Sequence, residues 1–291
     1  MGLKIGLALG GGAARGMAHL GVIDVLEEND VPIDLVVGTS IGSIIGAAYC
    51  SGQHGDLEEF ARHVDLWKMI SFFDVKLPRH GLLNGEVATK FLLEEIELPE
   101  IQDLPVPFAA VACDLDTGER VVLDRGSCFQ ALRASSAVPG LFEPVKVGKR
   151  FLVDGGLVDP IPVDVAREMG ADFVIGVDLN HYMLEARAEK REVGPATPPT
   201  GVLKRMEQKF GPFKNEVPPP IFEILLDSIY IMEKRISDSN ARTMPPDIML
   251  APELGEINFL DFFKAEKAID LGRKETEKRL GRILNMIRKS K

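Results

Sequence analysis

The chain has 291 residues, of which 45% are hydrophobic and 27% are charged, so it can bury at least one large core. Its 44 acidic residues outnumber its 34 basic residues, and the resulting net charge of −10 argues against a nucleic-acid partner. The three cysteines have no metal-ligand spacing and argue against a disulfide framework, so we expect a reducing, cytoplasmic location.

The first two predicted units each consist of a strand, a short glycine-containing turn and a helix. Residues 3–9 form an apolar strand, and a glycine loop joins it to a helix that ends near residue 29. Residues 34–39 form a second apolar strand, which is followed directly by a helix over residues 41–51. Two such units in succession predict parallel strands joined by right-handed crossovers.

The remaining pattern predicts one α/β domain with an interruption. The further helices are expected over 56–70, 86–96, 127–136, 162–169, 221–242 and 262–288, and the further strands over 108–115, 120–123, 172–179 and 247–251, with a hairpin-like unit around Gly148 over 146–153. We therefore expect a core over residues 1–180 and a C-terminal part over 221–291 that completes the same domain. The proline-rich segment 181–220 is interpreted as a mobile insert or lid, with Met183, Leu184, Phe210 and Phe213 as apolar contacts.

A G-x-S-x-G pattern lies at the junction between the second strand and its helix. Ser40 occupies the centre of the pattern, with Gly38 and Gly42 two residues to either side. This arrangement is typical of a nucleophile elbow, in which a serine oxygen projects from the end of a sheet above a helix N-terminus. A simpler interpretation is a turn between two core elements that is made flexible by its glycines.

A nucleophilic serine needs a base, and the sequence offers two candidates. Asp154 ends the apolar run 151–153 and precedes Gly155 and Gly156, so its carboxylate emerges where another group can approach closely. Partial burial beside an uncharged serine would raise its pKa and make it a stronger base, although an aspartate before two glycines is also a common turn. His181 is the alternative, since it follows both Asp154 and a predicted buried strand.

A glycine loop follows the first strand at Gly10, Gly11 and Gly12. Backbone N–H groups at such a helix N-terminus suit either a phosphate or a tetrahedral oxyanion. The loop matches neither the dinucleotide-binding pattern nor the P-loop, because Arg15 stands where the former needs its last glycine. Because Arg15 lies in the first helical turn, where a cation opposes the helix dipole, we expect it to have a carbonyl or anionic partner unless it is simply exposed.

Taken together, these motifs resemble those of the patatin-like phospholipase family, and above all its bacterial branch related to neuropathy target esterase. The resemblance is carried by Gly-Gly-Gly-Ala-Ala-Arg-Gly from residue 10, Gly-Thr-Ser-Ile-Gly from residue 38 and Asp-Gly-Gly from residue 154. The block Ala-Ser-Ser-Ala-Val-Pro-Gly-Leu-Phe-Glu-Pro from residue 134 is similar to one that precedes Asp-Gly-Gly in that family. The similarity extends over residues 4–179 and recurs over 246–272.

The resemblance implies a three-layer α/β/α sandwich with a mainly parallel central sheet and an enzyme that hydrolyses the acyl esters of lipids. It implies a dyad in which Ser40 is the nucleophile and Asp154 is the base and later the acid, with neither metal nor cofactor. It also implies an oxyanion hole made by the amides of Gly10, Gly11 and Gly12. Arg15, Gly38, Gly42, Gly155 and Gly156 are then the residues that support these motifs.

Two other classes of function stay open from the sequence. The glycine loop could bind a nucleotide or an acyl phosphate, or the chain could be a regulatory adaptor that keeps the fold. The basic helix over residues 272–291 carries an apolar stripe, so it could contact the inner membrane face peripherally. We favour the alternative that this stripe packs on the domain and that its cations complement the helix C-terminus.

Overall fold

The computed structural model describes residues 2–63, 89, 96, 98–186 and 221–290. The strands are β1 (Ile5–Leu9), β2 (Leu35–Thr39), β3 (Phe108–Asp114), β4 (Arg120–Leu123), β5 (Val145–Val147), β6 (Arg150–Asp154), β7 (Phe173–Val177) and β8 (Ile248–Leu250). The α-helices are α1 (Ala18–Glu28), α2 (Ile41–Cys50), α3 (His54–His63), α6 (Cys128–Ser135), α7 (Val163–Glu168), α10 (Ile221–Thr243) and α11 (Ala265–Ser290). Short 3₁₀ turns are η1 (Ala13–Met17), η2 (Ile101–Asp103), η3 (Gly155–Leu157) and η4 (Phe262–Lys264).

Two of the expected segments fall largely outside this description. They are most of the helix expected over 86–96, and residues 187–220 of the expected insert. Within the described residues, the elements follow the expected order, and the glycine loop leads into η1 before α1 begins at Ala18.

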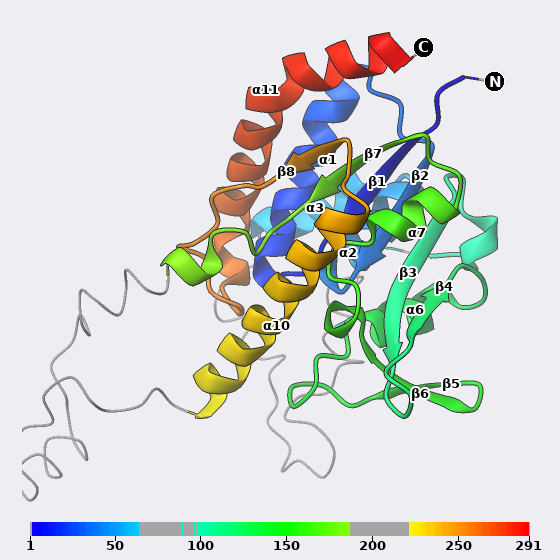
Figure 1. The fold of residues 1–291 in the computed structure, drawn as a ribbon, viewed down its shortest axis with the longest axis vertical. Helices are drawn as coiled ribbons and strands as arrows, with labels where there is room; N and C mark the ends of the chain where they lie inside the picture. The colour runs from blue at the N-terminus through cyan, green and yellow to red at the C-terminus, as the bar shows by residue number, and fades with distance from the viewer. Residues whose placement is uncertain (1, 64–88, 90–95, 97, 187–220, 291) are drawn as a thin grey trace, which may run out of the picture.

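The strands form one mixed sheet, in which the chain of pairings runs from β5 through β6, β3, β2, β1 and β7 to β8, and β4 also pairs with β3. The pairs β3–β2, β2–β1, β1–β7 and β7–β8 are parallel, whereas β4 and β6 run antiparallel to β3 and β5 runs antiparallel to β6. This mostly parallel sheet with helices packed against it confirms the expected α/β class, and Figure 1 shows the strands side by side.

Pairing along β3 brings two distant strand ends together. β4 pairs with residues 110–113 along one edge of β3. β2 pairs with residues 108–111 of β3 and β6 with residues 112–114, and both overlap the stretch that β4 covers, so both must use the other edge. Thr39 at the end of β2 pairs with Val111, and Asp154 at the end of β6 pairs with the next residue, Ala112. The residue after β2 and the last residue of β6 therefore meet end to end.

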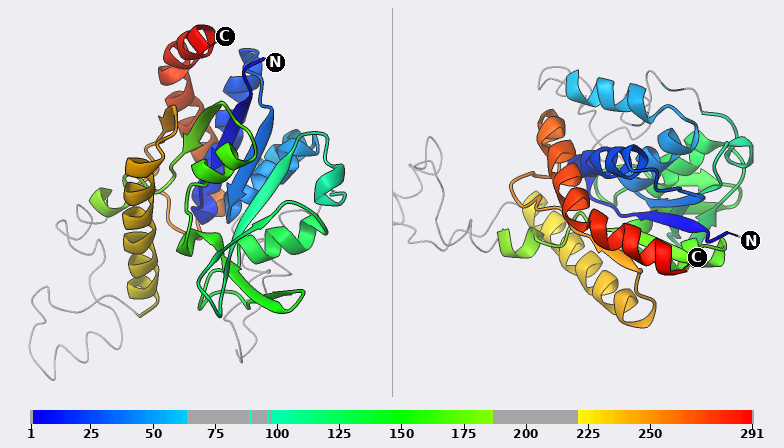
Figure 2. Two further views of the ribbon diagram at one scale, coloured as in Figure 1. Left: turned by 45° about the vertical axis from the view of Figure 1, so that its right-hand side comes forward. Right: turned by 90° about the horizontal axis from the view of Figure 1, so that it is seen from above.

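Apolar side chains cover both faces of the sheet. Ile5, Leu7 and Leu9 of β1 belong to the larger core cluster, which also contains residues of α1, α2 and α11. Ala8 of β1 faces the other way, into a second cluster with α7 and strand residues such as Val37. The alternation follows from the period-two geometry of a strand buried on both sides. Figure 2 shows α10 on the opposite side of the sheet from α1 and α3.

The C-terminal helix packs on the domain. Ile283 and Ile287 of α11 are buried in the larger core cluster, and Leu280 and Leu284 pack against it. The apolar stripe expected for residues 272–291 is thus used for packing, as the favoured interpretation proposed. No helix in the described part of the chain has the length and apolar character needed to cross a membrane.

Helices α1 and α11 approach each other through two glycines. A Cβ on Gly272 would lie 2.0 Å from the carbonyl oxygen of Ala18, and a Cβ on Gly21 would lie 2.0 Å from that of Ile269. Because both clashes are with backbone, neither can be relieved by moving a side chain. The close contact between these helices therefore depends on the absence of a side chain at both positions.

We predict that Gly272→Ala destabilises the fold by about 1–3 kcal/mol, because the added methyl group separates α1 from α11. Gly281→Ala is the matched control on the same helix, where a Cβ would meet nothing within 4 Å. It should stabilise the fold by roughly 0.5–1 kcal/mol through helix propensity. Thermal unfolding of both variants checks this, and a Gly272→Ala variant as stable as the wild type would contradict it.

Candidate active site

Ser40 sits in a strained turn at the end of β2. Its backbone has φ 57° and ψ −128°, a conformation that side-chain-bearing residues rarely adopt. A Cβ on Gly38 would lie 2.3 Å from the carbonyl oxygen of Gly42, and a Cβ on Gly42 would lie 2.3 Å from that of Leu9. The two glycines therefore let the helix start directly against the ends of β1 and β2, which accounts for the G-x-S-x-G spacing.

The hydroxyl of Ser40 contacts the carboxyl group of Asp154 directly. Ser40 Oγ donates a hydrogen bond to Asp154 Oδ2 at 2.6 Å, and the N–H of Gly156 donates to Oδ1 at 2.8 Å. Both side chains are buried, with exposures of 8% for Ser40 and 4% for Asp154. Burial raises the pKa of Asp154 to about 6 against the opposing effect of the two hydrogen bonds. Asp154 is thus a stronger base than an exposed aspartate and is still ionised at neutral pH.

Glycine is also required after Asp154. A Cβ on Gly155 would lie 2.3 Å from the carbonyl oxygen of Val111 on β3. The chain therefore turns tightly against β3 as it leaves β6, and this turn presents the N–H of Gly156 to the carboxylate. The sequence pattern Asp-Gly-Gly is explained by these two contacts.

Ser135 holds the backbone of the elbow, a role that sequence reasoning missed. The N–H of Ser40 donates to Ser135 Oγ at 2.9 Å, and Ser135 Oγ donates in turn to the carbonyl oxygen of Val111 at 2.6 Å. Ser135 is fully buried at the end of α6. The only signal in the sequence was its place in the block that begins at residue 134.

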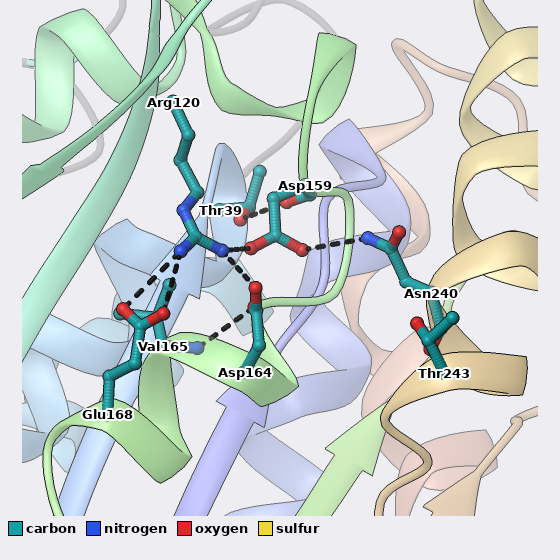
Figure 3. A network of polar contacts seen from close by, with 8 residues as sticks. All are labelled: Thr39, Arg120, Asp159, Asp164, Val165, Glu168, Asn240 and Thr243. Carbon is teal, nitrogen blue, oxygen red and sulfur yellow. Dashed lines mark hydrogen bonds and ion pairs between the residues drawn. The ribbon is translucent and has the colours of Figure 1, made fainter.

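A second polar network fixes the residue before the nucleophile (Figure 3). Thr39 Oγ1 donates to the carbonyl oxygen of Asp159 at 2.8 Å. The Asp159 carboxyl accepts from Arg120 of β4 at 3.1 Å and from Asn240 of α10 at 3.5 Å. Arg120 also contacts Asp164 and Glu168 of α7. The network thus joins the end of β2 to β4, α7 and α10.

The glycine loop offers fewer free amides than the sequence suggests. The N–H of Gly10 donates to the carbonyl oxygen of Val177, and that of Gly11 donates to the carbonyl oxygen of Pro160, both at 3.1 Å. Gly12 and Ala13 line a cavity together with Ser40, and in the described part of the chain their N–H groups have no backbone acceptor. Ala13 has a φ of 51°, so backbone strain is localised here. An oxyanion site at Gly12 and Ala13 fits this geometry better than one at all three glycines.

Arg15 is a buried cation, so its interpretation as an ordinary exposed arginine is wrong. The side chain is 0% exposed. It donates to Asn180 Oδ1 and to the carbonyl oxygen of Ile257, each at 3.2 Å, and lies 4.8 Å from the ring centre of Tyr230 on α10. Asn180 donates to the carbonyl oxygen of Gly11. Arg15 is therefore connected to the glycine loop through Asn180 and to α10 through the ring of Tyr230.

The geometry does not favour His181 as the base. Its Nδ1 lies 3.4 Å from Asp178 Oδ2, and a hydrogen bond that the imidazole donates to this carboxylate raises the pKa of His181. The ring also packs edge-on against Tyr182 and is about half exposed. Ser40 instead donates directly to Asp154.

Comparisons with known proteins place the chain in a family. The patatin-like phospholipase family matches residues 7–167. An uncharacterised NTE family protein of Mycobacterium tuberculosis is 32% identical over 94% of this chain and 46% of its own length. Lysophospholipase NTE1 of Mycosarcoma maydis is 38% identical over 61% of this chain and 10% of its own length.

Among solved structures, VipD of Legionella pneumophila has a similar fold, with a TM-score of 0.50 and 15% identity over 97% of this chain and 67% of its own. This chain spans about half the length of the mycobacterial relative. The family match covers more than half of the chain and includes both Ser40 and Asp154. The chain belongs to the patatin-like phospholipase family.

Proposed function

We propose that this chain is a serine acyl-ester hydrolase of the phospholipase or lysophospholipase type, with Ser40 as nucleophile and Asp154 as its base. The observation that carries the proposal is the 2.6 Å hydrogen bond from Ser40 Oγ to the buried Asp154 carboxylate. The strained elbow, family membership and the name of the fungal relative support a lipid ester as substrate. Peripheral contact with a lipid surface is part of this proposal, because such substrates reside there.

In the acylation step, Ser40 Oγ attacks the ester carbonyl carbon while its proton passes to Asp154 Oδ2. The carbonyl oxygen becomes an oxyanion, and we assign its stabilisation to the N–H groups of Gly12 and Ala13 and to the N-terminus of α2. The tetrahedral intermediate then collapses. The bond to the leaving alcohol breaks, the alcohol takes the proton from Asp154, and the acyl group remains on Ser40.

Deacylation reverses these roles with water as the nucleophile. Asp154 takes a proton from the water as its oxygen attacks the acyl carbon, and an oxyanion forms at the same place. When the intermediate collapses, Ser40 Oγ leaves and recovers the proton from Asp154, and a free fatty acid is released. A carboxylate with a pKa of about 6 suits both directions of transfer, since it is ionised at neutral pH yet accepts a proton readily.

Substitution of either dyad residue tests this proposal. We predict that Ser40→Ala abolishes covalent labelling by a fluorophosphonate and that Asp154→Asn lowers the rate of ester hydrolysis by about 10²–10⁴-fold. His181→Gln is the control, because that side chain contacts Asp178 rather than Ser40. The proposed dyad would be contradicted if Asp154→Asn were fully active, or if His181→Gln lowered the rate of ester hydrolysis as much as Asp154→Asn does.

Ser135→Ala tests the support of the elbow. The change leaves the buried N–H of Ser40 and the carbonyl oxygen of Val111 without this partner, which costs about 1–3 kcal/mol and displaces the nucleophile. We expect kcat/KM for an acyl ester to fall about tenfold or more. Ser136→Ala is the matched control, since Ser136 Oγ donates only to Leu132 within the same helix. Equal activities of the two variants would show that Ser135 plays no such part.

A further inference from the structure

The cavity beside Ser40 has mainly apolar walls and a carboxyl group that the proposed reaction leaves unused. Its volume is about 20 Å³, which is room for about one water molecule and not for an acyl chain. An acyl chain can therefore enter only if a wall moves. That carboxyl group belongs to Glu233, and the apolar wall residues are Val138, Pro139, Leu157, Ile229, Tyr230 and Phe259.

Glu233 reaches this cavity from α10, which also supplies Ile229 and Tyr230. Its Oε2 accepts a hydrogen bond from Asn180 Nδ2 at 2.9 Å. A Cβ added to Gly156 would lie 2.5 Å from Glu233 Oε1 and 3.1 Å from Asp154 Oδ1. The two carboxyl groups thus border the same small space, which the absence of a side chain at Gly156 leaves open.

The charges that face Glu233 come from three other elements. Arg15 of η1 is the cation, Asp154 of β6 is the nearest like charge, and Asp178 after β7 contributes a further negative charge. Asp178 is already paired with His181. Glu233 is therefore influenced by one buried cation, Arg15, and by the negative charges of Asp154 and Asp178.

Burial of the carboxyl group raises the pKa of Glu233 to about 8, and the charge of Asp154 adds to this effect, while Arg15 and the hydrogen bond from Asn180 oppose it. Asp154, with a pKa of about 6, loses its proton first. At neutral pH the site therefore holds an ionised Asp154 beside a neutral Glu233.

We propose that Glu233 is a specificity-determining residue of the acyl pocket, which admits long apolar acyl chains while it is neutral and excludes them when it is ionised. An apolar chain that fills the pocket removes water from its walls. Removing water from an ionised carboxylate is costly even where it accepts a hydrogen bond, whereas a neutral carboxyl that keeps its hydrogen bond with Asn180 tolerates it. The inference rests on the proposed function, because it assigns the acyl end of the substrate to this pocket.

The test compares two fluorophosphonates that differ only in their alkyl chain, ethyl or dodecyl, between pH 6 and pH 9.5. The measurement is the ratio of their second-order rate constants for labelling Ser40. The ratio cancels the pH dependence of Ser40 and Asp154, which both probes share. For the wild type we expect the dodecyl-to-ethyl ratio to fall about tenfold between pH 7 and pH 9, as the neutral share of a group with a pKa of about 8 falls from roughly nine-tenths to one-tenth.

Glu233→Gln should keep the high ratio throughout this range, because the amide is neutral at every pH and can still accept from Asn180. Asp238→Asn is the control, which removes one acidic group from the same helix at a half-exposed position paired with Lys234. It should behave as the wild type does. A ratio that is independent of pH in the wild type, or that falls equally in Glu233→Gln, would overturn the proposal.

Thermal unfolding without any probe separates this inference from the proposed function. Folding raises the pKa of Glu233 from 4.5 to about 8, so the folded state binds the Glu233 proton more tightly than the unfolded state does. The proton therefore stabilises the fold fully below about pH 4.5, and this stabilisation is lost as the pH rises to about 8. The melting temperature of Glu233→Gln relative to the wild type should therefore increase from pH 5 to pH 8. A difference in melting temperature that stays constant with pH would show that Glu233 is not protonated as proposed, even if the fluorophosphonate labels Ser40. A difference that increases with pH while Ser40 is not labelled would count against the proposed hydrolase instead.

Discussion

The site depends on a single steric arrangement, the end-to-end meeting of β2 and β6 on one edge of β3. Thr39 and Asp154 pair with consecutive residues of β3, so the residue after β2 and the last residue of β6 must touch. The hydrogen bond between Ser40 and Asp154 is the chemical consequence of this register. A shift of one residue in either pairing would turn a side chain to the opposite face and separate the two groups.

Glycines make this meeting possible because each stands where a backbone or a side chain comes too close for a Cβ. Gly42 lies against Leu9, Gly155 against Val111, and Gly156 against the carboxyl group of Glu233. The strain at Ser40 and Ala13 is maintained by the surrounding contacts, among them the hydrogen bond from Ser40 to Ser135. Close backbone packing and a serine hydroxyl held against a buried carboxylate are thus two results of the same local sequence.

The sequence allowed the strands, most of the described helices and the turns that carry Ser40 and Asp154 to be predicted, because those features have local signals. Apolar runs between glycine turns marked β1, β2 and β3, and Gly38, Gly42 and the glycines after Asp154 marked the two tight turns. Ser135 and Glu233 could not be found in this way. Their roles arise from which edge of β3 receives β6 and from where α10 packs, and neither is encoded within a window of neighbouring residues. The same holds for the amides of Gly10 and Gly11, whose acceptors belong to distant segments.

The proposed mechanism requires that Asp154 be a buried base that Ser40 contacts in solution, and ¹³C NMR titration of the Asp154 carboxyl carbon measures this most directly. The pKa should be about 6 in the wild type. It should rise further in Ser40→Ala, since the hydrogen bond from Ser40 lowers it. A pKa in the ordinary range for an exposed aspartate, or one that Ser40→Ala leaves unchanged, would contradict the account.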